Sequence, residues 1–152
     1  RADVELGIHA IVPVFMGRSV VVEKGNFDKK LDRWQKIADE AVKQCKRGII
    51  PEVRKNLDFK GMMADLNKED YDLVLLAYEN EEGYSIKDAL KECEPKPKSV
   101  AVIIGPEGGL ADDEVETVKQ SGAKVVTLGK TILRTETAGM AATAMIMYEL
   151  EL

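Results

Sequence analysis

The feature that most constrains the fold of this chain of 152 residues is a set of three continuous apolar runs. Each run leads through a polar or glycine-rich stretch into a helical pattern. The runs cover residues 72–78, 99–104 and 123–128. Strands that are apolar on both faces are typical of parallel sheets covered by helices on each side. The pattern therefore predicts an α/β fold with a parallel sheet, whose strands should present their carboxyl ends at one edge.

Amphipathic patterns predict helices between and around these strands. The longest should begin at Asn26 or Asp28, either of which can cap it, and should end near Cys45 before Gly48. A Ser cap favours a short helix that starts at Ser85. The remaining expected elements are helices near residues 57–66, 111–121 and 136–150, and strand-like runs at residues 10–15, 19–22 and 49–53.

The long helix has an apolar face and a basic face. Trp34 falls on the apolar face, so we expect it to pack in the core rather than to stack on a base. The net charge of the chain is −5, but residues 1–60 carry a net +4 and residues 61–152 a net −9. The basic face is therefore either a solvated helix surface or a surface that contacts phosphates. Its residues are Lys29, Arg33, Lys36, Lys43 and Arg47, interrupted by Glu40.

Composition disfavours several classes of protein. No apolar run approaches the ~20 residues that cross a bilayer, and residues 1–5 lack the basic and apolar segments of a signal peptide. A cytoplasmic location is therefore expected. Cys45, Cys93 and the single histidine, His9, are too few for a disulfide framework or a zinc site. We expect both thiols and His9 to be structural.

A glycine-rich loop follows the apolar run at residues 99–104. Its sequence, Gly-Pro-Glu-Gly-Gly at 105–109, matches neither the dinucleotide-binding fingerprint nor the P-loop. Glu107 and the acidic start of the next helix, residues 112–114, disfavour a phosphate and favour a ligand with positive charge, such as S-adenosylmethionine. A second loop at residues 128–138 should meet the first at the same edge of the sheet.

These two loops resemble the signature of a known family. The residues Gly105 to Gly109, followed by Leu128-Gly129 and by Ile132 to Ala138, are similar to the signature of the RsmE family of ribosomal RNA methyltransferases in the SPOUT superfamily. Residues 5–19 resemble the start of that family's methyltransferase domain, and residues 33–51 resemble its long basic helix and the turn beyond. The resemblance spans nearly the whole chain.

The resemblance implies a SPOUT methyltransferase domain over residues 1–152, with a parallel sheet flanked by helices, a C-terminal trefoil knot and a homodimer. It also implies an enzyme that uses S-adenosylmethionine to methylate N3 of a uridine in small-subunit ribosomal RNA. The alternative is an inactive RNA-binding or ribosome-associated SPOUT-like module. Family members also carry an N-terminal RNA-binding domain resembling a PUA barrel. We expect it to be absent here, and we therefore expect weak binding of ribosomal RNA.

The resemblance and the chemistry of methyl transfer select candidate catalytic residues. Arg134 is the candidate for steadying negative charge on the uracil oxygens, and Glu136 or Glu40 for accepting the proton. Structural alternatives are pairing of Arg134 with Glu136 or with a helix end, and neutralisation of the basic face by Glu40. No metal is expected.

The resemblance and the sequence pattern also select candidate residues for binding RNA and the cofactor. The RNA contacts are expected at Arg18, Arg33, Lys36, Lys43 and Arg47. The cofactor pocket is expected at the ends of three strands, from Ala77, Tyr78, Ile104, Gly105, Pro106, Glu107, Gly108, Leu128, Gly129, Ile132 and Leu133.

Overall fold

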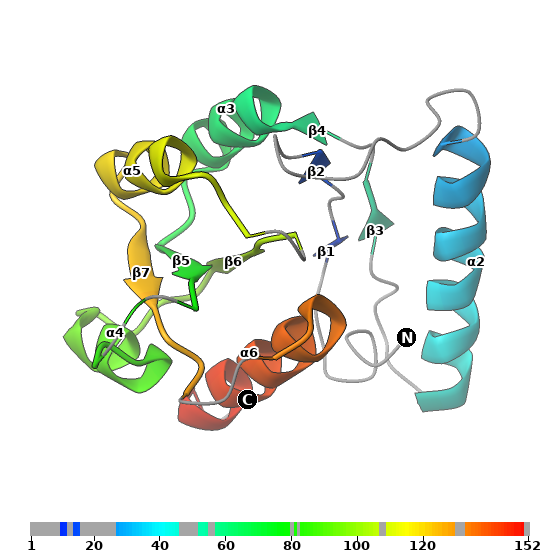
Figure 1. Cartoon of the computed structure of the whole chain (residues 1–152). Coiled ribbons are helices and arrows are strands. Elements are labelled where there is room, and N and C mark those ends of the chain that lie inside the picture. Colours follow the sequence, from blue (N-terminus) through cyan, green and yellow to red (C-terminus); the bar gives the residue numbers. More distant parts are fainter. Residues whose placement is uncertain are drawn as a thin grey trace.

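The centre of the structure is a parallel sheet of three strands. The computed structural model describes residues 10–11, 14–15, 27–45, 52–54, 57–79, 81, 83–106, 109–129 and 133–150. β5 (Leu73–Ala77) lies between β6 (Val100–Ile104) and β7 (Lys124–Val126), and both neighbours run parallel to it. The parallel sheet predicted from the three apolar runs is confirmed, and helices flank it (Figure 1).

Helices cover both faces of this sheet. On one face, α3 (Phe59–Glu69) and α5 (Asp112–Gln120) pack against β5 through a cluster that includes Met62, Leu76 and Val118. Leu76 and Val118 have no exposed surface. Since the side chains of a strand alternate between its two faces, the neighbours of Leu76 point to the opposite helix layer.

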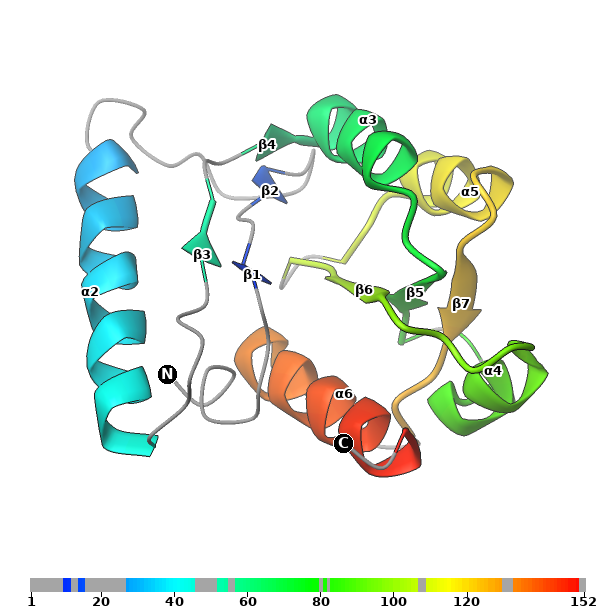
Figure 2. The same cartoon turned by 180° about the vertical axis from the view of Figure 1, so that it is seen from behind.

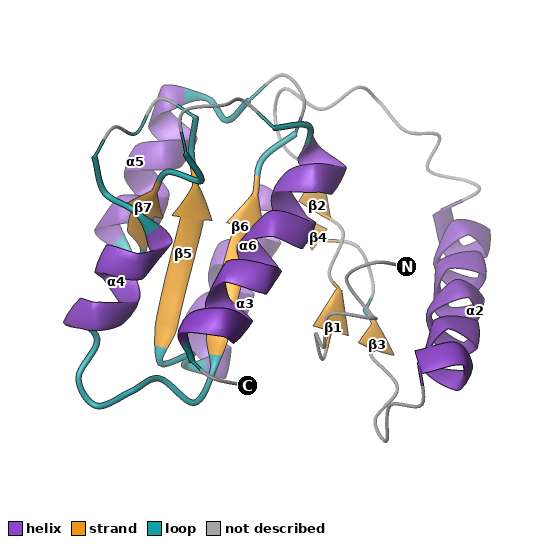
Figure 3. Cartoon of the chain, turned by 90° about the horizontal axis from the view of Figure 1, so that it is seen from below, coloured by secondary structure: helices purple, strands orange, loops and turns teal. Residues whose placement is uncertain are grey.

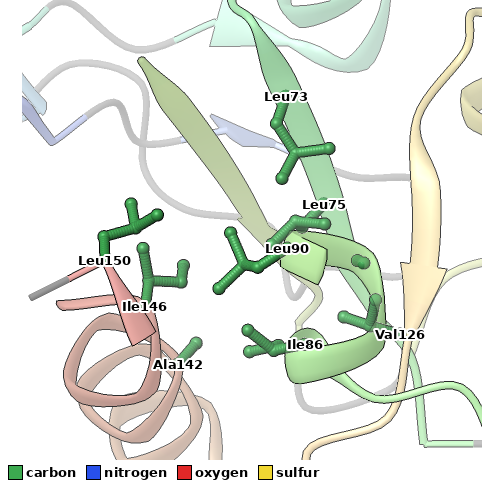
Figure 4. Packing of buried hydrophobic residues seen from close by; sticks show 9 residues of the cluster. Leu73, Leu75, Ile86, Leu90, Val126, Ala142, Ile146 and Leu150 are labelled. Atoms are coloured by element: carbon green, nitrogen blue, oxygen red, sulfur yellow. The ribbon is translucent and has the colours of Figure 1, made fainter. Parts of the chain in front are cut away.

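The opposite layer contains α4 (Ile86–Glu92) and α6 (Thr135–Glu149). Leu73 and Leu75 of β5 point toward these helices, where they meet Ile86 of α4 and Ile146 of α6 (Figure 4). Each fully buried side chain of this size contributes about 1.5–3 kcal/mol relative to its exposed state. Burial on both faces explains why β5 has no polar residue.

A second group of short strands lies beside the main sheet. β1 (Ala10–Ile11) pairs in parallel with β3 (Glu52–Val53), and β2 (Val14–Phe15) pairs in parallel with β4 (Leu57–Asp58). The strand-like run predicted over residues 10–15 therefore contains two short strands, and each pairs with a different partner strand. The run predicted at residues 19–22 lies outside the described residues.

The long helix α2 (Phe27–Cys45) has the bounds that the sequence predicts. It lies at the outer edge of the molecule, beyond β1 and β3 (Figure 2). Ala38 and Ala41 are buried, but Trp34 keeps 38% of its surface exposed, so the expectation that Trp34 packs in the core is wrong. Among the described elements, α2 packs mainly against β3, a strand too short to cover the apolar face of a 19-residue helix.

Local hydrogen bonds fix the ends of the helices behind the main sheet. The predicted cap of α4 is confirmed: Asp88 N donates to Ser85 Oγ at 3.1 Å, and Ser85 N donates to Asp88 Oδ2 at 3.0 Å. The bond from Ser85 N to the carboxylate, together with hydrogen bonding from the Ser85 side chain, lowers the pKa of the Asp88 carboxyl. At the other end of this layer, Lys96 Nζ donates to the carbonyl of Leu150 at 2.6 Å, just beyond α6.

Candidate functional site

The carboxyl ends of the three sheet strands lie level with one another. Ala77 is in register with Ile104 on one side and with Val126 on the other, and Tyr78 N donates to the Val126 carbonyl at 3.0 Å. The ends of β5 and β6 point to the same side of the molecule (Figure 3). The loops after these strands therefore start at one edge of the sheet, which is the place where α/β sheets bind ligands.

The first loop leaves β6 at Gly105. Gly109 N donates to the Pro106 carbonyl at 2.8 Å, and Gly109 has a φ of +76°, which closes a turn that favours glycine. Leu110 follows and is buried, and a Cβ added to Gly105 would lie 3.4 Å from its Cγ. This distance is an ordinary van der Waals contact, so Leu110 packs directly beneath the start of the loop. The candidates Glu107 and Gly108 lie outside the described residues.

The acidic start of α5 divides into two kinds of carboxylate. Asp112 and Asp113 are exposed, as a surface near a cationic ligand would require. Glu114 is buried at 8% exposure, and its Oε1 accepts a hydrogen bond from Ala111 N at 2.9 Å. Glu114 therefore fixes the end of the first loop to α5, a structural role that sequence reasoning did not assign to it.

The second loop leaves β7 at Thr127. Its backbone N–H donates to the Tyr84 carbonyl at 2.8 Å, and its hydroxyl contacts both the amide and the carbonyl of Gly129. Gly129 has a φ of +130°. Leu128 and Leu133 are half-buried, whereas the candidate Ile132 lies outside the described residues. Tyr78 after β5, Pro106 after β6 and Leu128 after β7 thus lie just beyond the carboxyl ends of their strands, and a cofactor pocket formed from them stays a prediction.

The candidate catalytic residues fall in two places. Arg134 is exposed at the N-cap of α6, where its carbonyl accepts from Ala138 N at 2.7 Å. Glu136 lies in the first turn of the same helix, and its side chain is outside the described part of the structure. Glu40 is exposed on α2, which lies across β1 and β3 from α6 (Figure 1). Arg134 and Glu136 thus belong to the start of α6, directly after the second loop, whereas Glu40 belongs to the separate helix α2.

The candidate RNA contacts lie along α2. Arg33, Lys36 and Lys43 are all exposed, so the basic face predicted from the helical spacing is open to solvent. Glu40 is exposed as well. Arg18 and Arg47 lie outside the described residues.

Sequence reasoning missed the contacts that support the second loop. Tyr84 donates its hydroxyl proton to Glu92 Oε2 at 2.6 Å, while its carbonyl holds Thr127. Burial and this bond to Glu92 raise the pKa of Tyr84 to about 12. The position of Tyr84 directly before the Ser85 cap was the one signal that could have pointed to it.

A hollow of about 400 Å³ lies at the opposite, amino edge of the sheet. Its lining includes Asp72 before β5, Cys93 after α4, and Lys124 at the start of β7. It contains none of the residues predicted to bind a ligand. Within the part of the chain that the structure describes, no group of histidine, cysteine and acidic residues is placed to hold a metal ion. No helix in that part has the length and apolar character that spanning a membrane requires.

Comparison with known proteins shows the family of the chain. A family model described as an RNA methyltransferase domain matches residues 1–147. The ribosomal RNA small subunit methyltransferase E of Bacillus subtilis (strain 168) is 38% identical over 97% of this chain and 59% of its own length. The protein of that name from Aquifex aeolicus (strain VF5) is 34% identical over 97% of this chain and 60% of its own length.

A solved structure with a bound ligand also matches. The ribosomal RNA small subunit methyltransferase E from Neisseria gonorrhoeae bound to S-adenosyl methionine has a TM-score of 0.80 and 32% identity, and the match covers 97% of this chain and 57% of that one. The chain therefore spans less than two thirds of the length of these relatives.

Proposed function

The chain belongs to the RNA methyltransferase domain family, and we propose that it binds S-adenosylmethionine and transfers the methyl group to N3 of a uridine in small-subunit ribosomal RNA. The family resemblance identified from the two loops is confirmed by the relatives. The observation that carries the proposal is the Neisseria gonorrhoeae structure with its bound S-adenosyl methionine, because its likeness covers 97% of this chain.

The described residues at the carboxyl edge suit this cofactor. Exposed Asp112 and Asp113 near the first loop favour the sulfonium and ammonium charges of the cofactor. Gly129 has no side chain to keep a ligand from its backbone, and a Cβ added there would meet no atom of the described residues within 4 Å. Half-buried Tyr78 and Leu128 supply apolar surface for an adenine ring. When bound, the cofactor supplies an electrophilic methyl group.

The protein's part in the reaction is to position the uridine and to manage its charge. Loss of the N3 proton leaves negative charge on the uracil oxygens, and exposed Arg134 beside the second loop is the proposed partner for that charge. Glu136 is the proposed base within the same copy, since it lies two residues away on α6. Glu40, on α2 outside the two loops, is the alternative proposed base.

The proposed assembly is a homodimer. On α6, Met140 and Met145 are 39% exposed and Tyr148 is 83% exposed, which leaves apolar surface for a second copy to cover. The proposed topology is the C-terminal trefoil knot that the family resemblance implies.

RNA is proposed to bind along the basic face of α2. Arg33, Lys36 and Lys43 supply positive potential that the acidic residues 61–152 lack. Binding through phosphates releases counterions, so the affinity should fall as salt rises. Reversal of Arg33 and Lys36 to Glu should reduce methylation and leave cofactor affinity unchanged. The matched control reverses Lys119 and Lys124, which are exposed elsewhere on the molecule.

Calorimetric titration of S-adenosylmethionine into this chain tests the proposal. We expect saturable one-site binding, and no binding of ATP, which shares the adenosine but carries phosphates that the acidic edge disfavours. Transfer of labelled methyl groups to unmodified small ribosomal subunits then tests the activity, with Glu136→Gln expected to lose more of it than Glu40→Gln. Absence of cofactor binding would favour the inactive RNA-binding module.

A further inference from the structure

We propose that Thr127 is a positioning residue whose hydroxyl sets the backbone of Gly129 for contact with the cofactor. The inference rests on the proposed function, because the ligand it concerns is the cofactor at the carboxyl edge. It goes beyond that function by giving a role to a side chain outside the predicted site.

The backbone of Thr127 is itself fixed by hydrogen bonding. Its N–H donates to the Tyr84 carbonyl at 2.8 Å, and Ser85 forms an isolated parallel bridge with it. Tyr84 is in turn tied to α4 by its 2.6 Å hydrogen bond to Glu92. These contacts anchor the start of the second loop to α4.

The hydroxyl of Thr127 extends this anchor into the loop. Gly129 N lies 3.2 Å from Oγ1 as a donor, and the Gly129 carbonyl lies 3.0 Å from Oγ1 as an acceptor. A serine or threonine hydroxyl that binds the backbone two residues ahead stabilises a turn. Here it holds Gly129 at a φ of +130°, a conformation that other residues rarely adopt.

Gly129 lies where a small shift of its backbone would weaken the binding of the cofactor. It is exposed, it follows the level end of β7 by three residues, and it precedes the loop that leads to Arg134. The hydroxyl occupies the N–H of Gly129 and thereby decides which way its peptide group faces. Loss of the hydroxyl would free this peptide, and the cofactor would have to order it again on binding.

Thr127→Val tests this role because valine keeps the shape and removes only the hydroxyl. We expect the dissociation constant for S-adenosylmethionine, measured by calorimetry, to rise about tenfold. The amide proton of Gly129, followed by NMR without ligand, should exchange faster with water. Thr127→Ser keeps the hydroxyl and should bind the cofactor like the wild type. Thr117→Val, which removes a hydroxyl bonded to the Asp113 carbonyl on α5, should also bind normally.

A measurement on the wild type alone keeps the test independent of variant stability. Saturation with S-adenosylmethionine should shift the Gly129 amide resonance and leave that of Gly122, a glycine with a φ of +99° at the other edge, in place. If the cofactor binds but Gly129 does not respond, or Thr127→Val binds as well as the wild type, the positioning role is wrong. If the wild type does not bind the cofactor at all, the proposed function fails and this inference falls with it.

Discussion

Replacement of Glu114 by Ala should destabilise the chain by about 2 kcal/mol. The buried carboxylate of Glu114 accepts from Ala111 N at 2.9 Å, and a hydrogen bond to a charged group contributes about 1.5–3 kcal/mol. An acidic residue in the first helical turn adds about 0.3–1 kcal/mol through the helix dipole. The Ala variant no longer pays the free-energy cost of burying a carboxylate, which offsets part of this loss of stability.

Urea denaturation followed by circular dichroism measures the effect. For a slope of about 2 kcal/mol per molar, the midpoint should fall by about 1 M, and the melting temperature should fall by roughly 4–8 °C. Glu114→Gln keeps an oxygen acceptor without the charge and should lose about half as much.

The matched control is Glu116→Ala, an exposed position on the same helix, which should change stability by less than about 0.5 kcal/mol. If Glu114→Ala is no more destabilising than this control, the Glu114 to Ala111 bond does not fasten the first loop, and the reasoning is refuted.

Three further perturbations test other parts of the structure. Leu76→Ala removes a fully buried side chain from β5 and should cost about 2–5 kcal/mol in unfolding free energy by urea titration; a loss below 1 kcal/mol would contradict the packing. Ser85→Ala removes the cap of α4 and should cost about 1 kcal/mol, whereas Ser85→Thr should restore most of it. Tyr84→Phe tests pH dependence: the folded state favours neutral Tyr84, so its contribution is complete below the ordinary pKa of 10.0 and is lost as the pH rises toward about 12. The stability difference between wild type and Tyr84→Phe should therefore shrink across that interval, and a constant difference would argue against the Glu92 bond.

Local signals made much of the fold predictable from the sequence. The runs that became β5, β6 and β7 are continuous and apolar because helices cover both sheet faces. Ser85 marks the start of α4 because its hydroxyl satisfies a backbone N–H that the helix itself cannot. The loops of the candidate site were found for a related reason, since each follows such a run directly.

Contacts between distant residues were not predictable in this way. The central place of β5 depends on which strands pair, and strand order leaves no local pattern. Trp34 has apolar spacing, yet its exposure depends on how much of α2 the short strand β3 covers. Glu114 looked like one of three exposed acids, and only the three-dimensional path of the first loop shows that Ala111 N meets it.

The position of bound S-adenosylmethionine in an experimental structure of this chain tests the central claim most directly. The account predicts the cofactor at the carboxyl edge, against Gly105 and Pro106 of the first loop and against Leu128 and Gly129 of the second. A cofactor found instead in the hollow at the amino edge, near Asp72 and Lys124, would contradict it.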